Sequence, residues 1–207
     1  MEVAIEAVPK LRRREKTRQR LLASALGIFA RNGYERATVD EIVRDAGFSK
    51  GAFYVHFKSK DDLFWTMLEE RILHRQDAFR QSVTPGASFR QNVRGLLTAI
   101  FDLESEDPSW PAIVMEFAAH AGRNAEVRDR FATIYERWRE VIVAMLRRGQ
   151  AAGQVRDDID LAFAASAAIA LIEGTITQSR LAPNEIVLDE MIDPLCALLS
   201  QALEEPA

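Results

Sequence analysis

Residues 38–60, TVDEIVRDAGFSKGAFYVHFKSK, constrain the fold more than any other part of the chain. Thr38 is a good N-cap, and Glu41 follows three residues later, which is the pattern of a capping box. Gly47 supplies the left-handed residue that ends a helix. Ser49 then caps a second short helix that runs to about Phe57. Between the caps, apolar residues recur at helical spacing: Val39, Ile42, Val43 and Ala46. The segment therefore predicts two short helices joined by a tight turn.

Helical spacing continues through almost the whole chain. A first helix ends at Gly33, and Ser59 caps a fourth helix from Lys60 to about Ser82. Further helices are expected at 88–105, 111–121, 124–151, 158–180 and 185–203, and Pro194 should kink or split the last one. The fold class is all-α, with a small three-helix head and a larger helical body. The expected domains are a flexible basic arm at 1–13, the head at 14–59 and the body at 60–207.

Charge is divided unevenly between these parts. Residues 1–60 hold 13 Lys and Arg against 7 Asp and Glu, a net charge of +6, whereas residues 61–207 hold 14 against 24, a net charge of −10. A basic head on an acidic body favours a local polyanion site. A solvated surface of different composition would give the same numbers.

Two helices joined by a tight turn form a helix-turn-helix, whose second helix enters the major groove of DNA. Phe53 and Phe57 lie one turn apart and are expected to anchor that helix to the core. The opposite side then presents Lys50, Gly51, Tyr54 and His56. Lysine reaches base edges such as guanine O6, and tyrosine or histidine donates to phosphate oxygens. Each residue has an alternative role: Tyr54 as a cover for the core edge, and His56 or Lys60 as a solvated surface side chain.

These residues resemble the TetR family of transcriptional repressors. The matching motifs are REKTRQRLLASALGIFARNGY, TVDEI and AGFSKGAFYVHFKSKDDL, in that order, within about Arg14 to Leu68. The resemblance implies a homodimer that binds a palindromic double-stranded DNA operator and releases it on binding a small-molecule effector. The family's phosphate contacts map to Thr38, Tyr54, His56 and Lys60, and its recognition positions map to Ser49, Lys50 and Gly51. Val55 departs from relatives that carry a polar or aromatic residue there.

The same resemblance assigns the body two roles, effector binding and dimerisation through residues 158–203. A run of small residues, 163–170, allows close helix approach, and Ala165 is a candidate interface residue. An intramolecular core would look similar. The candidate effector contacts are mostly aromatic, and they would also serve as plain core: Phe101, Trp110, Met115, His120, Phe131, Tyr135, Trp138 and Glu173.

Other functional classes find little support in the sequence. Glu116 and His120 are spaced as metal ligands can be, but no second pair accompanies them, so no metal and no cofactor is expected. No catalytic motif is present, which argues against an enzyme. No uninterrupted apolar run approaches the ~18 residues of a membrane span, and the single cysteine, Cys196, favours the cytoplasm. A constitutive DNA-binding protein or an activator without a small-molecule ligand remains the alternative.

Overall fold

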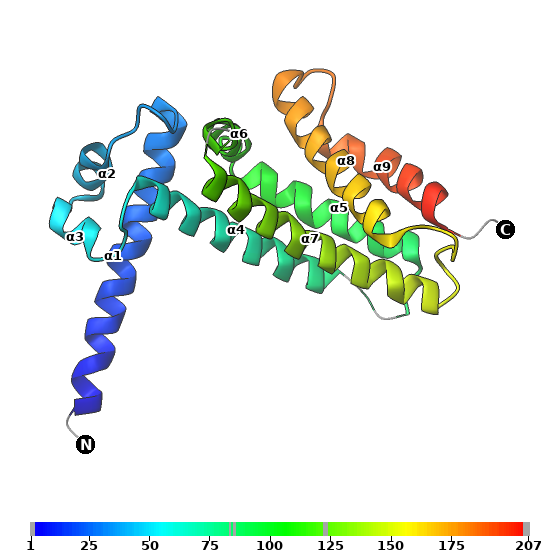
Figure 1. Cartoon of the computed structure of the whole chain (residues 1–207), viewed down its shortest axis with the longest axis horizontal. Helices are drawn as coiled ribbons and strands as arrows, with labels where there is room; N and C mark the ends of the chain where they lie inside the picture. Colours follow the sequence, from blue (N-terminus) through cyan, green and yellow to red (C-terminus); the bar gives the residue numbers. More distant parts are fainter. Residues whose placement is uncertain (1–2, 83, 85, 122–123, 205–207) are drawn as a thin grey trace. The chain divides into compact units, whose positions relative to one another are not determined.

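The computed structural model describes residues 3–82, 84, 86–121 and 124–204; the side chains of residues 3–11, 120 and 121 lie outside this description. Its described residues form helices and no strand, which confirms the all-α fold class. The helices are α1 (Val3–Asn32), α2 (Val39–Ala46), α3 (Lys50–Tyr54), α4 (Lys60–Ser82), α5 (Phe89–Glu106), α6 (Trp110–Ala121), α7 (Ala125–Ala151), α8 (Leu161–Leu181) and α9 (Leu188–Leu203) (Figure 1).

The chain divides into two compact units. The head unit comprises Met1–Ile72 and Ile113–Phe117, and the body unit comprises Leu73–Ala112 and Ala118–Ala207. The boundary lies inside α4, so this helix is covalently continuous from one unit into the other. The expected boundary after residue 59 had assigned the whole of α4 to the body.

The head unit closes around a core of aromatic rings. Phe29, Tyr34 and Phe64 are buried and in ring contact, and Phe117 stacks on Phe64 with ring centroids 3.9 Å apart. Fully burying one phenylalanine contributes about 1.5–3 kcal/mol relative to leaving it exposed. Phe53 is completely buried, so α3 is anchored to this unit as the sequence predicts.

The body unit has one hydrophobic core, built from α5, α7, α8 and α9 with the end of α4. Leu97 and Phe101 of α5 are completely buried in it. Cys196 is 2% exposed in the same core, as expected for a small apolar residue. This core gives α5 and α7–α9 fixed neighbours, so cavities between them have defined walls.

Three details differ from the sequence-based expectations. The backbone is helical from Val3, where a loose arm was expected; most residues there, apart from Pro9, are compatible with a helix. α3 ends at Tyr54, earlier than Phe57, since Val55 and His56 turn the chain toward Ser59. α9 continues through Pro194, so the expected split is wrong, while the expected kink stays a prediction; the buried face of α9 on the core outweighs one missing backbone hydrogen bond.

One helix has the composition of a membrane span. α8 is long enough and, averaged over 18 residues, apolar enough to cross a bilayer, although no uninterrupted apolar run is that long. Ala165, Ala168 and Ile172 of α8 are buried within the body unit. Of the 18-residue apolar window, 33% is buried in the single chain, and one such helix is weak evidence for a membrane span because helices of soluble proteins pass the same test of length and hydropathy.

Candidate DNA interface and effector cavity

The helix-turn-helix is held in shape by side-chain caps. Thr38 accepts a hydrogen bond from the Glu41 amide, and the Glu41 carboxylate accepts from the Thr38 amide at 2.8 Å, so the predicted capping box is confirmed. Gly47 has φ +72° and ends α2, and Ser49 accepts from the Ala52 amide to begin α3. These local bonds fix the angle at which α3 leaves the turn.

The residues expected to read DNA lie on or next to α3. Tyr54 is 57% exposed and the Lys50 side chain 56% exposed, and Gly51 is exposed without a side chain to block approach. Lys50 pairs with Asp40 at 2.8 Å, and this hydrogen bond raises the pKa of the lysine. Lys50 must leave Asp40 to reach a base edge. An exposed ion pair of this kind is worth only about 0–1 kcal/mol, so the exchange is inexpensive.

His56 lies beside basic residues of α1. Burial lowers the pKa of its imidazole, and the charges of Arg14 and Arg18 lower it further. The ring is therefore mostly neutral at neutral pH and carries one N–H that can donate to a phosphate. Val55 is 62% exposed, which leaves its methyl groups on the surface.

Two side chains that are expected to contact phosphate, those of Thr38 and Lys60, already form hydrogen bonds within the head unit. The Thr38 hydroxyl donates to Glu41 at 2.8 Å. The Lys60 ammonium donates to three backbone carbonyls, of Tyr34 at 2.7 Å, Glu35 at 3.2 Å and Ala37 at 2.9 Å, and lies over the Tyr34 ring. Burial lowers the pKa of Lys60. A phosphate contact by Lys60 stays a prediction, and it would require these bonds to break.

In the body unit, three of the expected effector contacts come together. Trp138 of α7 and Glu173 of α8 line one small cavity, which we call the inner cavity, and the Tyr135 hydroxyl donates to Glu173 at 3.0 Å. The volume of the inner cavity is about 30 Å³, enough for a water molecule. Burial raises the pKa of Glu173 and also raises the pKa of Tyr135.

The other expected effector contacts lie elsewhere. Phe101 and Trp110 are buried at 0% and 4% exposure, and neither lines the inner cavity; Phe131 is half-buried and does not line it either. Met115 belongs to the head unit. The side chain of His120 lies outside the described residues.

Glu116, the other candidate metal ligand, has a different role in the head unit. Its carboxylate accepts from the Tyr34 amide at 2.7 Å and occupies the space beside Gly33. Within the described residues, no group of three or more His, Cys, Asp or Glu side chains could hold a metal ion.

Sequence reasoning missed a buried charge cluster beside the inner cavity. Glu104 is completely buried and forms an ion pair with Arg75 of α4, and Arg180 of α8 donates to its backbone carbonyl at 3.0 Å. Glu104 lies on the same buried stripe of α5 as Leu97 and Phe101. A carboxylate at a position that helical spacing predicts to be buried was the sequence signal that could have indicated this cluster. Arg75 also lines the inner cavity, so this cluster joins the cavity wall to α4.

Comparison with known proteins agrees with this arrangement. Residues 21–65 match the model of the bacterial regulatory proteins of the tetR family, and residues 89–204 match the C-terminal domain of BetI-type transcriptional repressors, more than half of the chain. The chain belongs to the TetR family. Its head is a DNA-binding helix-turn-helix, the protein is a transcriptional regulator, and the family is not enzymatic.

Individual relatives are distant but cover most of the chain. The fatty acid metabolism regulator protein of Bacillus subtilis is 23% identical over 184 residues, covering 89% of this chain and 90% of its own. A crystal structure of FadR from the same species in complex with stearoyl-CoA has a TM-score of 0.78 at 19% identity, with 88% and 97% coverage. A transcriptional regulator from Saccharomonospora viridis in complex with choline has a TM-score of 0.78 at 23% identity, with 93% and 100% coverage. At these identities the two structures show the shared fold alone.

Proposed function

We propose that this TetR-family regulator is a homodimeric repressor that binds a palindromic operator and is released by a small-molecule effector. The observation that carries the proposal is the face of α3. Buried Phe53 holds the helix to the head unit while Lys50, Gly51 and Tyr54 remain exposed beside it. Phosphate contacts by Tyr54 and His56 would position the head, and Lys50 would read a base edge. Such a protein acts on the chromosome in the cytoplasm.

The proposed dimer interface is a stripe on α8 whose residues 163, 167, 170 and 181 are exposed and whose residues 174 and 177 are half-buried. Residues 163, 167, 170, 174, 177 and 181 are spaced alternately by four and three, which is the seam spacing of two packed helices. Phe163 and Leu181, at its ends, are 73% and 76% exposed, and Gly174 faces open space. Leu198 of α9 is 54% exposed as well. A second copy would bury these apolar side chains within the proposed interface, residues 158–203.

Ala165 does not belong to this stripe. It is completely buried in the body unit of a single chain, so a charge there would test folding and not dimerisation. We therefore keep residues 158–203 as the proposed interface. Within this range we assign the contacts to the exposed residues of α8 and α9 and not to Ala165.

The proposed effector acts through α4. Arg75, on the body part of this helix, lines the inner cavity and pairs with buried Glu104, and the same helix begins in the head unit at Lys60. A ligand that displaces Arg75 from Glu104 would therefore shift α4. An effector that couples to DNA binding by a typical 1–3 kcal/mol weakens operator affinity roughly 5- to 150-fold.

The test is to recover DNA fragments bound by the full chain and measure affinity for the recovered site. Two-fold related half-sites are expected, with centres about 34–36 Å apart or a multiple of this. Lys50→Ala should relax base preference at one position per half-site, while the exposed control Lys58→Ala should keep the wild-type preference. Absence of sequence-specific binding, or an operator without two-fold symmetry, would contradict the proposal.

A further inference from the structure

Three hollows in the body unit share walls and form a row. An open cleft of about 490 Å³, which we call the arginine cleft, lies against the end of α4, the start of α5 and the C-terminal part of α7. Next is an apolar cavity of about 20 Å³ between α5, α7, α8 and α9. Phe89 and Met145 line both of these. The inner cavity follows, and it shares Leu96, Ile142 and Ile172 with the apolar cavity.

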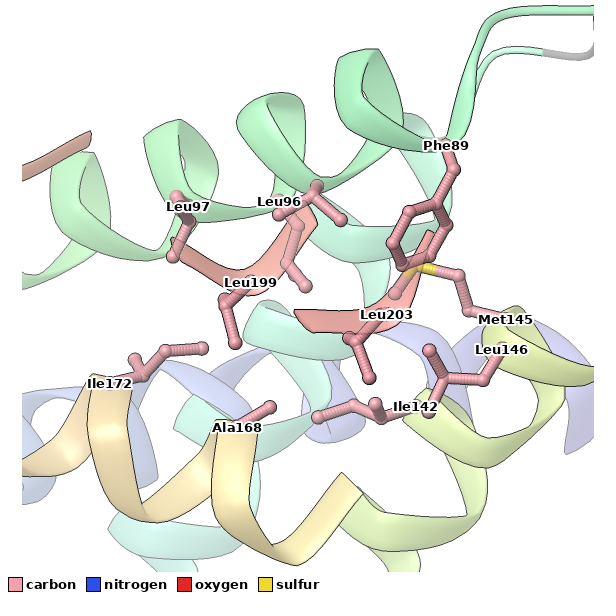
Figure 2. A pocket seen from close by; sticks show the side chains of 11 residues that line it. Phe89, Leu96, Leu97, Ile142, Met145, Leu146, Ala168, Ile172, Leu199 and Leu203 are labelled. Atoms are coloured by element: carbon pink, nitrogen blue, oxygen red, sulfur yellow. The ribbon is translucent and has the colours of Figure 1, made fainter. Parts of the chain in front are cut away.

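The middle of the row accepts only hydrocarbon. Its wall consists of Phe, Val, Leu, Ile, Met and Ala side chains, with no polar side chain among them. Figure 2 shows Phe89 and Met145 together at one end of the apolar cavity and Ile172 near the other. Cavities lined in this way stay dry and bind apolar groups. Methionine is flexible, so Met145 can swing aside to admit a chain.

The outer end of the row is basic. Arg80 and Arg148 line the arginine cleft together with the amide side chains of Asn92 and Gln154, and among the residues that the structure describes no Asp or Glu lines it. Arg80 pairs with Asp77 at 2.6 Å, but this pair is exposed and costs little to exchange. Arg148 is exposed and has no partner among the described residues.

The far end of the row disfavours an anion. Glu173 lies in the inner cavity, and the positive charge of Arg75 beside it is already neutralised by buried Glu104. An anionic group is therefore attracted to the cleft and repelled from the inner cavity. This charge difference gives a bound amphiphile one orientation.

We infer that the effector is an amphiphile with an anionic head and an unbranched alkyl chain. The head, a carboxylate or a phosphate, pairs with Arg80 and Arg148 in the arginine cleft. The chain passes between Phe89 and Met145 into the apolar cavity and pushes toward the inner cavity. Because the apolar cavity as it stands is smaller than a long chain, filling it spreads α5, α7 and α8. This inference rests on the proposed function, since it names the ligand class for the same regulator.

The experiment uses the full chain and calorimetric titration with hexanoate, dodecanoate and hexadecanoate, all below their micelle concentrations. Each methylene that becomes buried should strengthen binding about fourfold, until the chain outgrows the cavities. Dodecyl phosphate should bind as dodecanoate does, and dodecyltrimethylammonium should not bind. Equal affinity for the cation, or affinity that does not change with chain length, would overturn the inference.

Two variants test the placement of head and chain. Arg148→Ala should weaken dodecanoate binding about threefold to tenfold, whereas Arg147→Ala, the adjacent exposed arginine outside the cleft, should not. Leu203→Ala enlarges the apolar cavity and should strengthen binding of hexadecanoate relative to hexanoate. Equal effects of the two arginine variants, or no change in chain-length preference in Leu203→Ala, would contradict this placement.

The outcome can be separated from that of the proposed function by measuring operator release. Dodecanoate and hexadecanoate should release the operator, and hexanoate should not. Release by some other compound, with no binding of any anionic amphiphile, would refute the ligand class and leave the proposed function intact. Absence of operator binding would refute the proposed function, whatever the titrations show.

Discussion

Replacing Lys60 by methionine distinguishes two roles of this residue: holding the connection between α1 and α2, and contacting a DNA phosphate. Its ammonium donates to the carbonyls of Tyr34, Glu35 and Ala37, in the connection that leads from α1 to the N-cap of α2. A hydrogen bond to a charged group contributes about 1.5–3 kcal/mol. The three are not additive, and burial of the ammonium, which lowers the pKa of Lys60, offsets part of the gain. We therefore expect Lys60→Met to lower the free energy of unfolding by about 2–4 kcal/mol.

The assay combines urea denaturation with operator binding at several salt concentrations. If Lys60 acts by holding this connection, affinity falls at every salt concentration while the slope of log K against log salt stays unchanged. A phosphate contact would make that slope shallower by about 0.9. Lys58→Met, which removes an exposed lysine two residues earlier, is the stability control. Unchanged stability together with a shallower slope would refute the positional role.

Two further predictions concern the body unit. Phe163→Glu should convert the dimer to monomers in sedimentation while Ala162→Glu, exposed on the same helix but outside the stripe, should not; dimers in both would place the interface elsewhere. Glu173→Gln should raise stability at neutral pH, because burial raises the folded-state pKa of Glu173 and its ionisation then opposes folding. The wild type should lose stability relative to Glu173→Gln as pH rises from about 4.5 through the folded-state pKa, by about 1.4 kcal/mol per unit of pKa difference. A difference between the two proteins that does not change with pH would show that ionisation is not its cause.

Much of the head could be predicted because its signals are local. The Thr38–Glu41 capping box and the left-handed Gly47 depend on residues only a few positions apart. The same holds for the burial of Phe53 and Phe57, one turn apart on the inner side. The role of Lys60 depends instead on carbonyls 23 to 26 residues away, which no local pattern indicates.

The inner cavity, our candidate effector site, was only partly predictable, since a cavity is a place where packing is incomplete. Of the aromatic candidates for effector contact, Tyr135 bonds to Glu173 and Trp138 lines the inner cavity with it, whereas Phe101 and Trp110 are buried in the core; their contact with an effector stays a prediction. The composition of a helix face indicates which side chains are buried. It does not indicate whether the facing side chains fill the space beside them or leave a cavity. Arg75 lies in the cavity wall and forms an ion pair with Glu104, which is 29 residues away in the chain. No local sequence pattern indicates a contact over that distance.

For the proposed dimer stripe, the sequence alone does not show which face of α8 is exposed. Small residues run through the first half of α8, so composition cannot distinguish its inner from its outer face. The structure distinguishes them: Ala165, Ala168 and Ile172 are buried, and the residues offset from them, at 163, 167 and 170, are exposed. Continued at alternating intervals of four and three, this series passes through half-buried 174 and 177 to exposed Leu181, and Phe163 and Leu181 are the large apolar side chains at its ends. Large side chains at the ends and small ones between them allow close approach of a second helix, which is why we assign the partner to this face and the core to the other.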